Sequence, residues 1–162
     1  MQKLRLFTVT TAIGIVFAAI FIFTGINPDT ASAYSPSQHR AIHFITHGAS
    51  TTAHIIDTTS AACDAGGNGN RARSVTLIRH AVRDFIKLRN AWIRLPAAGG
   101  AAWRVEHLFH RLLERDVRVY VLCVANIAAG DTTYSNLTRG LRAYDRSLSD
   151  LSKVCVELRR LR

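Results

Sequence analysis

The chain has 162 residues, of which 21 are Lys or Arg and 11 are Asp or Glu, so its formal net charge at neutral pH is +10. A chain of this length is expected to fold as one domain, which buries an adequate core without metal or disulfide cross-links. The basic character favours anionic partners such as lipid headgroups, cell-wall polymers, nucleic acid or acidic proteins, but no block of consecutive basic residues indicates a binding tail.

The N-terminal residues have the organisation of an export signal. Lys3 and Arg5 form a short positive start, and no charged residue occurs from Leu6 to Ile26. Pro28 then interrupts the apolar segment. A positive start followed by an apolar stretch is typical of a secretory signal peptide.

The small residues Ala31-Ser32-Ala33 suit a signal peptidase, so we expect cleavage after Ala33 and a signal peptide that spans residues 1–33. An uncleaved signal anchor is the alternative, because the apolar stretch approaches the roughly 20 residues that span a bilayer. Under either interpretation residues 34–162 form the domain, which is secreted, extracellular or periplasmic. The membrane is a partner only through the N-terminal segment, if that segment is uncleaved.

A first helical segment is predicted from about Ser37 to Ala62. Its apolar residues on one face are Ile42, Ile45, Ala49, Ala53 and Ile56. Gly48 and the run Ser50-Thr51-Thr52 disfavour helix, so the sequence predicts a kink or break near Gly48.

The same segment carries a histidine face that consists of His39, His43, His47, His54 and Asp57. On a continuous helix these five residues occupy one arc of about 80°, separate from the apolar face. Histidines four residues apart place neutral imidazoles on neighbouring turns, where they chelate Zn, Cu or Ni, and a carboxylate completes the shell. The hypothesis is therefore a transition-metal or haem site. A polar face that happens to use histidine, or a pH-responsive surface, are the alternatives.

Flexible breaks at residues 64–70 and 96–100 delimit a second segment. Its apolar stripe contains Val75, Ile78, Val82, Phe85 or Ile86, and Ile93. The residues Arg79, Arg83, Lys87 and Arg94 fall outside this stripe, so we expect an amphipathic helix with a basic surface. A surface that merely keeps the protein soluble is the alternative.

The stretch Val75–Arg83 resembles the motif of the histidine phosphatase superfamily, in which an apolar strand precedes Arg-His-Gly. The resemblance implies that His80 is a phosphorylated nucleophile and that Arg79 and Arg83 hold the phosphate. Ala81 stands where the family has glycine, and no second family motif follows.

The third segment has an apolar stripe made of Val105, Phe109, Leu113, Val117, Tyr120, Val124 and Ile127. This spacing predicts a helix, although the β-branched run from Val117 to Val124 is compatible with a strand. A fourth segment follows the break at Gly130-Asp131. Its stripe is Tyr134, Leu137, Leu141, Tyr144, Leu148, Leu151, Cys155 and Leu158, and Asp131, Thr132 or Thr133 would cap its start.

Four amphipathic segments with short connections predict an all-α fold, namely a small antiparallel four-helix bundle after the N-terminal signal segment. In such a bundle Cys63 and Cys123 lie near one end, whereas Cys155 is roughly 20 Å away along the axis. We therefore expect a Cys63–Cys123 disulfide with Cys155 as a buried free thiol, unless a reducing compartment keeps all three cysteines as thiols.

No complete catalytic constellation is present, so the leading hypothesis is a non-enzymatic, exported binding protein. Its basic surface would meet an anionic or protein partner outside the cytoplasm, and its histidine face would hold a metal or haem. A secreted cytokine-like or effector bundle is one alternative. A histidine-phosphatase-like enzyme that uses Arg79 and His80 is the other.

Overall fold

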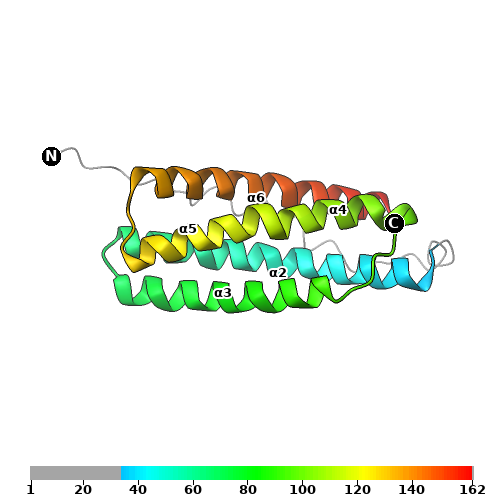
Figure 1. The fold of residues 1–162 in the computed structure, drawn as a ribbon, viewed down its shortest axis with the longest axis horizontal. Coiled ribbons are helices and arrows are strands. Elements are labelled where there is room, and N and C mark those ends of the chain that lie inside the picture. Colours follow the sequence, from blue (N-terminus) through cyan, green and yellow to red (C-terminus); the bar gives the residue numbers. More distant parts are fainter. Residues whose placement is uncertain (1–33, 162) are drawn as a thin grey trace.

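The computed structural model describes residues 34–161, and these residues form helices joined by short connections (Figure 1). The elements in chain order are α2 (Pro36–Gly67), α3 (Arg71–Ile93), the 3-10 helix η2 (Gly100–Ala102), α4 (Trp103–Arg111), the π-helix η3 (Leu112–Val117), α5 (Arg118–Ala129) and α6 (Tyr134–Arg160). The predicted all-α class is confirmed, and residues 34–161 contain no strand. The predicted export signal at residues 1–33 lies outside the described residues.

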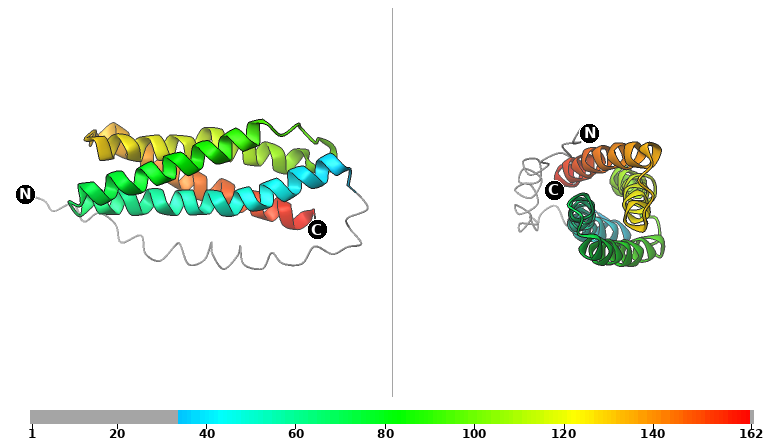
Figure 2. Two further views of the ribbon diagram at one scale, coloured as in Figure 1. Left: turned by 90° about the horizontal axis from the view of Figure 1, so that it is seen from below. Right: turned by 90° about the vertical axis from the view of Figure 1, so that its left-hand side faces the viewer.

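Four long helical segments share one long axis (Figure 1), and the third of them consists of α4, η3 and α5 in direct succession. Seen from one end, α2, α3, α5 and α6 surround a common interior (Figure 2). Helix α2 contacts α3, α5 and α6, while α3 also packs on α5, and α6 packs on both α4 and α5. Each segment therefore buries one face in a single shared core.

Helix α2 runs without a break from Pro36 to Gly67, so the break predicted near Gly48 is wrong. The start of α2 has a capping box, in which the Ser35 hydroxyl accepts from the Gln38 amide and the Gln38 side chain accepts from the Ser35 amide. Gly48 lies on the buried face, against the ring of Phe109. Packing against this ring favours the helix more than the low propensity of glycine disfavours it.

The third segment is helical throughout, so the alternative of a strand from Val117 to Val124 is wrong. The predicted stripe from Val105 to Val124 is buried, and Phe109 has no solvent-exposed surface. In the π-helix η3 the backbone hydrogen bonds join residues five apart, whereas those of an α-helix join residues four apart. Four of its six residues are buried, namely Leu112, Leu113, Asp116 and Val117.

Helices α3 and α6 bury most of their predicted stripes and depart from them at a few positions. In α3, Phe85 is buried and Ile86 is 49% exposed, which settles the predicted choice between them. In α6, Tyr134 and Leu141 are exposed, whereas Gly140 and Ala143 are buried in their place. Helix α5 approaches α6 closely at Gly140, where no side chain separates the two helices.

The position of Gly140 shows how close that approach is, because a Cβ atom built there would lie 3.3 Å from the Cβ of Cys123. The start of α6 is as predicted, since the Thr133 hydroxyl accepts from the Asn136 amide at 3.3 Å. The Asn136 side chain then donates to the carbonyl oxygens of Cys123 and Asp131 and fixes the turn between α5 and α6.

Candidate binding groove

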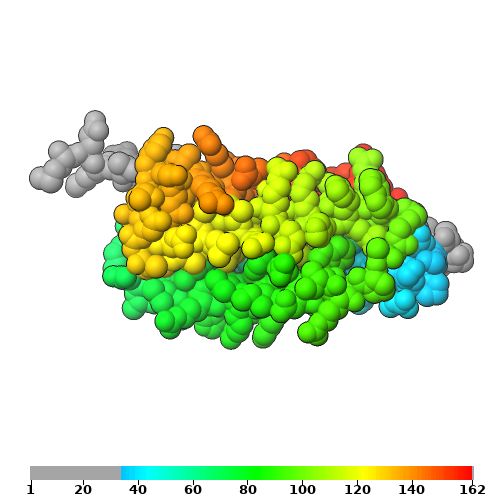
Figure 3. All heavy atoms as spheres, viewed as in Figure 1, coloured from blue at the N-terminus to red at the C-terminus, as the bar shows by residue number. Residues whose placement is uncertain are grey.

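A groove of about 450 Å³ lies between α3 and α5 and is open to solvent. Its lining consists of Ile78, Arg79, Val82, Arg83, Ile86 and Lys87 of α3 with Ala125 of α5. On the face shown in Figure 3, the atoms of α3 and α5 meet along a shared seam. The sequence-predicted basic surface therefore borders this groove through three of its four residues.

The two sets of α3 residues have the same spacing. Ile78, Val82 and Ile86 recur every fourth residue, and so do Arg79, Arg83 and Lys87. Residues four apart lie one above the other on a helix, so the apolar residues form one row and the cations form a second row beside it. The result is an apolar floor with a positive border.

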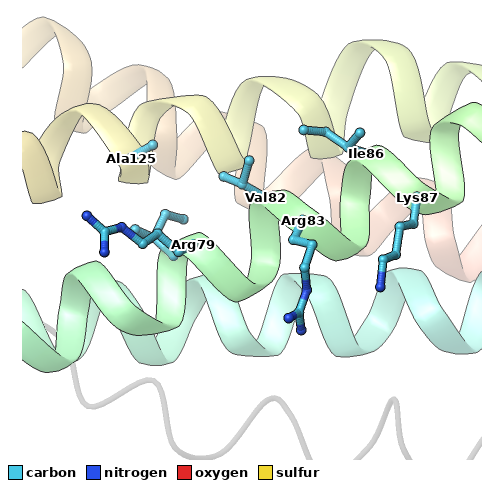
Figure 4. Close-up of a pocket in the computed structure, with 7 residues that line it drawn as sticks. Arg79, Val82, Arg83, Ile86, Lys87 and Ala125 are labelled. Atoms are coloured by element: carbon cyan, nitrogen blue, oxygen red, sulfur yellow. The ribbon is translucent and has the colours of Figure 1, made fainter.

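Figure 4 shows how these side chains are directed. Val82, Ile86 and Ala125 face the space between the two helices, whereas Arg83 and Lys87 extend outward on the side of α3 away from α5. The aliphatic stems of the basic residues thus cover apolar surface while the charged groups reach solvent. Arg94, the fourth predicted basic residue, is exposed at the C-cap of α3 and does not line the groove.

The cations of the groove differ in their partners. The Nε atom of Arg83 lies 3.3 Å from Oδ1 of Asp84, its neighbour in sequence. Among the described residues, Arg79 and Lys87 have no carboxylate within ion-pair distance. The border consequently keeps a net positive charge that an anionic partner would neutralise.

Leu122 of α5 is a further exposed apolar residue near the groove in sequence, although it does not line the groove. It lies three residues before Ala125, hence on the same side of the helix, and is 51% exposed. Together with Ile86 it accounts for two of the large hydrophobic side chains that remain in solvent. Exposed apolar side chains that gather in a patch are a feature of interaction surfaces.

The Arg79–His80 stretch lies in the middle of α3, not in the strand that the phosphatase resemblance implies. His80 is exposed, and its Nδ1 atom lies 3.4 Å from a guanidinium nitrogen of Arg83. The groove lies on the Arg79 and Val82 side of the helix. Around His80 the described residues therefore lack the strand-to-loop setting in which that family holds its nucleophile.

The histidine face is borne by one continuous helix, as the predicted arc requires, but only part of it converges. The Nε2 atoms of His43 and His47 are 3.3 Å apart, and both rings are exposed. His39 instead packs against the ring of Tyr34 at 5.8 Å. His54 is exposed on a later turn of α2.

No group of three or more His, Cys, Asp or Glu side chains within residues 34–161 is arranged to hold a metal ion. Asp57, the predicted carboxylate ligand, is half-buried on α2. The predicted five-residue site is thus represented in the structure by one pair of histidines.

All three cysteines are free thiols in the structure, which therefore lacks the predicted Cys63–Cys123 disulfide. Cys123 is buried against α6 beside Gly140, and Cys63 is partly buried near the end of α2. Burial raises the pKa of Cys63, and the nearby negative charge of Asp64 raises it further. Burial likewise raises the pKa of Cys123 and Cys155, so all three are poor nucleophiles at neutral pH.

A buried acidic pair at η3 was missed by the sequence analysis. Asp116 of η3 has no exposed surface, and Asp150 of α6 is 5% exposed. Asp150 accepts hydrogen bonds from Arg111 Nε at 2.8 Å and from Lys153 Nζ at 2.7 Å. The Nε atom of Arg146 lies 3.2 Å from Asp116 Oδ1, although neither carboxyl oxygen of Asp116 receives a hydrogen bond.

The pKa values of the two acids are shifted in opposite directions. Burial raises the pKa of Asp116, and the adjacent carboxyl of Asp150 raises it further, against the lowering effect of Arg115 and Arg146. Burial alone would raise the pKa of Asp150, but the hydrogen bonds from Lys153 and Arg111 outweigh it and lower that pKa. Of the two acids, Asp116 is therefore the harder to ionise and Asp150 the easier. In the sequence, the sign of this buried pair was the position of Asp116 next to Val117, a residue of the apolar stripe.

Within residues 34–161 no helix combines the length and apolar character needed to cross a bilayer. Comparison of the chain with protein-family models, with curated proteins and with solved structures found no match.

Proposed function

We propose that this chain is a small, exported, non-enzymatic binding protein, folded as an antiparallel four-helix bundle, whose groove between α3 and α5 receives an acidic amphipathic helix of a partner protein. The observation that carries the proposal is the pair of parallel rows along α3, one apolar and one cationic, at the edge of an open groove. Export and a partner outside the cytoplasm are proposed from the N-terminal sequence of residues 1–33.

The repeat of the two rows suits a helical partner. Side chains four residues apart on α3 are separated by about 6 Å along the axis, and a second helix presents its own side chains at the same interval. A partner helix with an apolar stripe would pack its side chains over Ile78, Val82 and Ile86. This is the helix-in-groove mode of recognition.

The positive charge beside the groove favours a partner helix with acidic side chains on either side of its apolar stripe. Carboxylates beside the apolar stripe would reach Arg79 and Lys87, which have no ion-pair partner among the described residues. Such exposed pairs contribute modestly to affinity, but they raise the association rate and exclude basic competitors. Burial of Ile86 and Leu122, both about half exposed, would supply most of the favourable free energy.

The shape of the groove favours a peptide helix over other anionic ligands. A single lipid would require an enclosed channel for its acyl chain, whereas this groove is open along its length. Nucleic acid would match the cations but would leave the apolar floor unused. Vesicles and duplex DNA are therefore informative competitors in the test.

The test uses two synthetic helical peptides that share one leucine stripe and differ in their flanks, which are glutamate in one peptide and lysine in the other. Backbone amide chemical shifts of the protein would be followed during titration. We expect saturable binding of the glutamate peptide, with shifts concentrated in α3 and α5. The lysine peptide should bind at least tenfold more weakly.

Matched variants locate the site. The double substitution Arg79→Glu with Lys87→Glu should weaken binding of the glutamate peptide at least tenfold, and so should Ile86→Asn. Arg142→Glu is the control, because Arg142 is exposed on α6, which does not line the groove. The proposal is wrong if both peptides bind equally, if the control weakens binding as much, or if anionic vesicles or duplex DNA bind more tightly than the glutamate peptide.

A further inference from the structure

The strongest geometric feature outside the groove is the histidine pair on α2. The Nε2 atoms of His43 and His47 are 3.3 Å apart, their ring centroids are 4.5 Å apart, and the ring planes meet at 60°. The two Nε2 atoms thus converge on one point beside the helix. Both side chains are exposed, so an ion in solution has direct access to them.

The separation of the two nitrogens indicates a coordination geometry. In a tetrahedral zinc site with Zn–N bonds of about 2.0–2.1 Å, two imidazole nitrogens are about 3.3–3.4 Å apart. In a square-planar site with similar bonds, neighbouring nitrogens would be only about 2.9 Å apart. The observed 3.3 Å is the edge of the tetrahedron.

The chemistry of the pair agrees with this geometry. In the absence of metal one Nε2 must donate and the other must accept for the rings to hydrogen bond, so the pair holds one shared proton. If both rings carry their proton on Nδ1, both Nε2 lone pairs are free for a metal ion. To bind the ion, the donor ring carries its proton on Nδ1 instead of Nε2, so each neutral ring keeps one proton and both Nε2 atoms are free to coordinate.

We propose that His43 and His47 bind a Zn²⁺ ion through their Nε2 atoms. The protein supplies two ligands, and the other two tetrahedral positions are open to water or to donors of another molecule. This site has fewer ligands than the sequence predicts, because His39, His54 and Asp57 are not part of it and residues 34–161 contain no group of three ligands. It lies on α2, which contributes no residue to the groove between α3 and α5, so it does not depend on the proposed function.

The experiment is a competition titration in which the protein and a chromogenic zinc chelator share a limiting amount of Zn²⁺ at slightly alkaline pH. We expect one Zn²⁺ per chain. His43→Ala and His47→Ala should each weaken zinc binding at least tenfold. His54→Ala is the matched control, since it removes an exposed histidine from the same helix but leaves the pair intact.

Two results would overturn the proposal. One is a zinc affinity that falls as much in His54→Ala as in His43→Ala, which would indicate a diffuse histidine surface. The other is the absence of binding at millimolar Zn²⁺ in a protein whose circular dichroism is helical. Because these side chains are exposed, the alanine variants are expected to fold, and their helical signal provides the check.

Discussion

Gly48 of α2 and Phe109 of α4 are in such close contact that a Cβ atom built on Gly48 would lie 2.6 Å from Cζ of the Phe109 ring. The ring has no exposed surface and is surrounded by other aromatic groups, with the Trp92 centroid at 5.1 Å and the Phe44 centroid at 6.3 Å. The absence of a side chain at residue 48 thus lets α2 approach the central aromatic cluster of the core.

Gly48→Ala should therefore destabilise the protein. The methyl group would overpack a rigid aromatic core, which typically costs 1–3 kcal/mol, while the higher helix propensity of alanine returns about 1 kcal/mol. We expect a net loss of about 1 kcal/mol in the free energy of unfolding, measured by urea denaturation. Gly67→Ala is the control, because a Cβ at that position meets no atom within 4 Å. A stabilised Gly48→Ala protein would contradict the close contact.

Asp116→Asn should stabilise the protein more at neutral pH than at acidic pH. The pKa of Asp116 is raised in the folded state, mainly by burial, so the folded protein loses stability as the pH rises above the ordinary carboxyl pKa towards the raised value. Asparagine carries no charge, so the variant does not bear the cost of ionising a buried side chain.

We expect the difference in unfolding free energy, variant minus wild type, to increase by about 1 kcal/mol between pH 3 and pH 7. Urea denaturation at both pH values measures it. A difference that is constant with pH, or that decreases, would show that Asp116 is ionised in the folded protein at no cost.

Asp150→Asn should have the opposite pH dependence. The pKa of Asp150 is lowered in the folded state, so its contribution to stability is present above the ordinary carboxyl pKa and is lost as the pH falls through the lowered value. The variant loses charge-assisted hydrogen bonds from Arg111 and Lys153. We expect a loss of about 1–3 kcal/mol at pH 7 and a much smaller loss near pH 2, by the same denaturation measurement. An equal loss at both pH values would contradict the lowered pKa.

Thr133→Ala should lower the unfolding free energy by about 1 kcal/mol, because the Thr133 hydroxyl accepts a hydrogen bond from the first turn of α6. Thr132→Ala removes the neighbouring hydroxyl, which does not cap the helix, and should change stability by less than about 0.5 kcal/mol. Thermal unfolding followed by circular dichroism distinguishes the two variants. The capping assignment fails if Thr132→Ala is the more destabilised of the two.

The amino-acid sequence was sufficient to predict the all-helical class, the breaks between the four segments and a cap at the start of α6. These features depend on local properties, namely the period of apolar residues, glycine and proline in the connections, and short oxygen side chains before a helix. The stripe from Val105 to Val124 was correct for the same reason. A basic surface was also predicted from residue types on one side of a helix.

Tertiary packing decided the rest, because the depth to which a residue is buried depends on the neighbouring helix and not on the residue alone. Close contact with α5 buries Gly140 of α6, while Leu141 next to it is exposed. The π-helix places Asp116 in the interior, and a low-propensity Gly48 continues α2 because the Phe109 ring occupies the space of its missing side chain. The packing of α3 on α5 also decides which apolar residues of α3 enter the core. Phe85 is buried there, whereas Val82 and Ile86 line the groove.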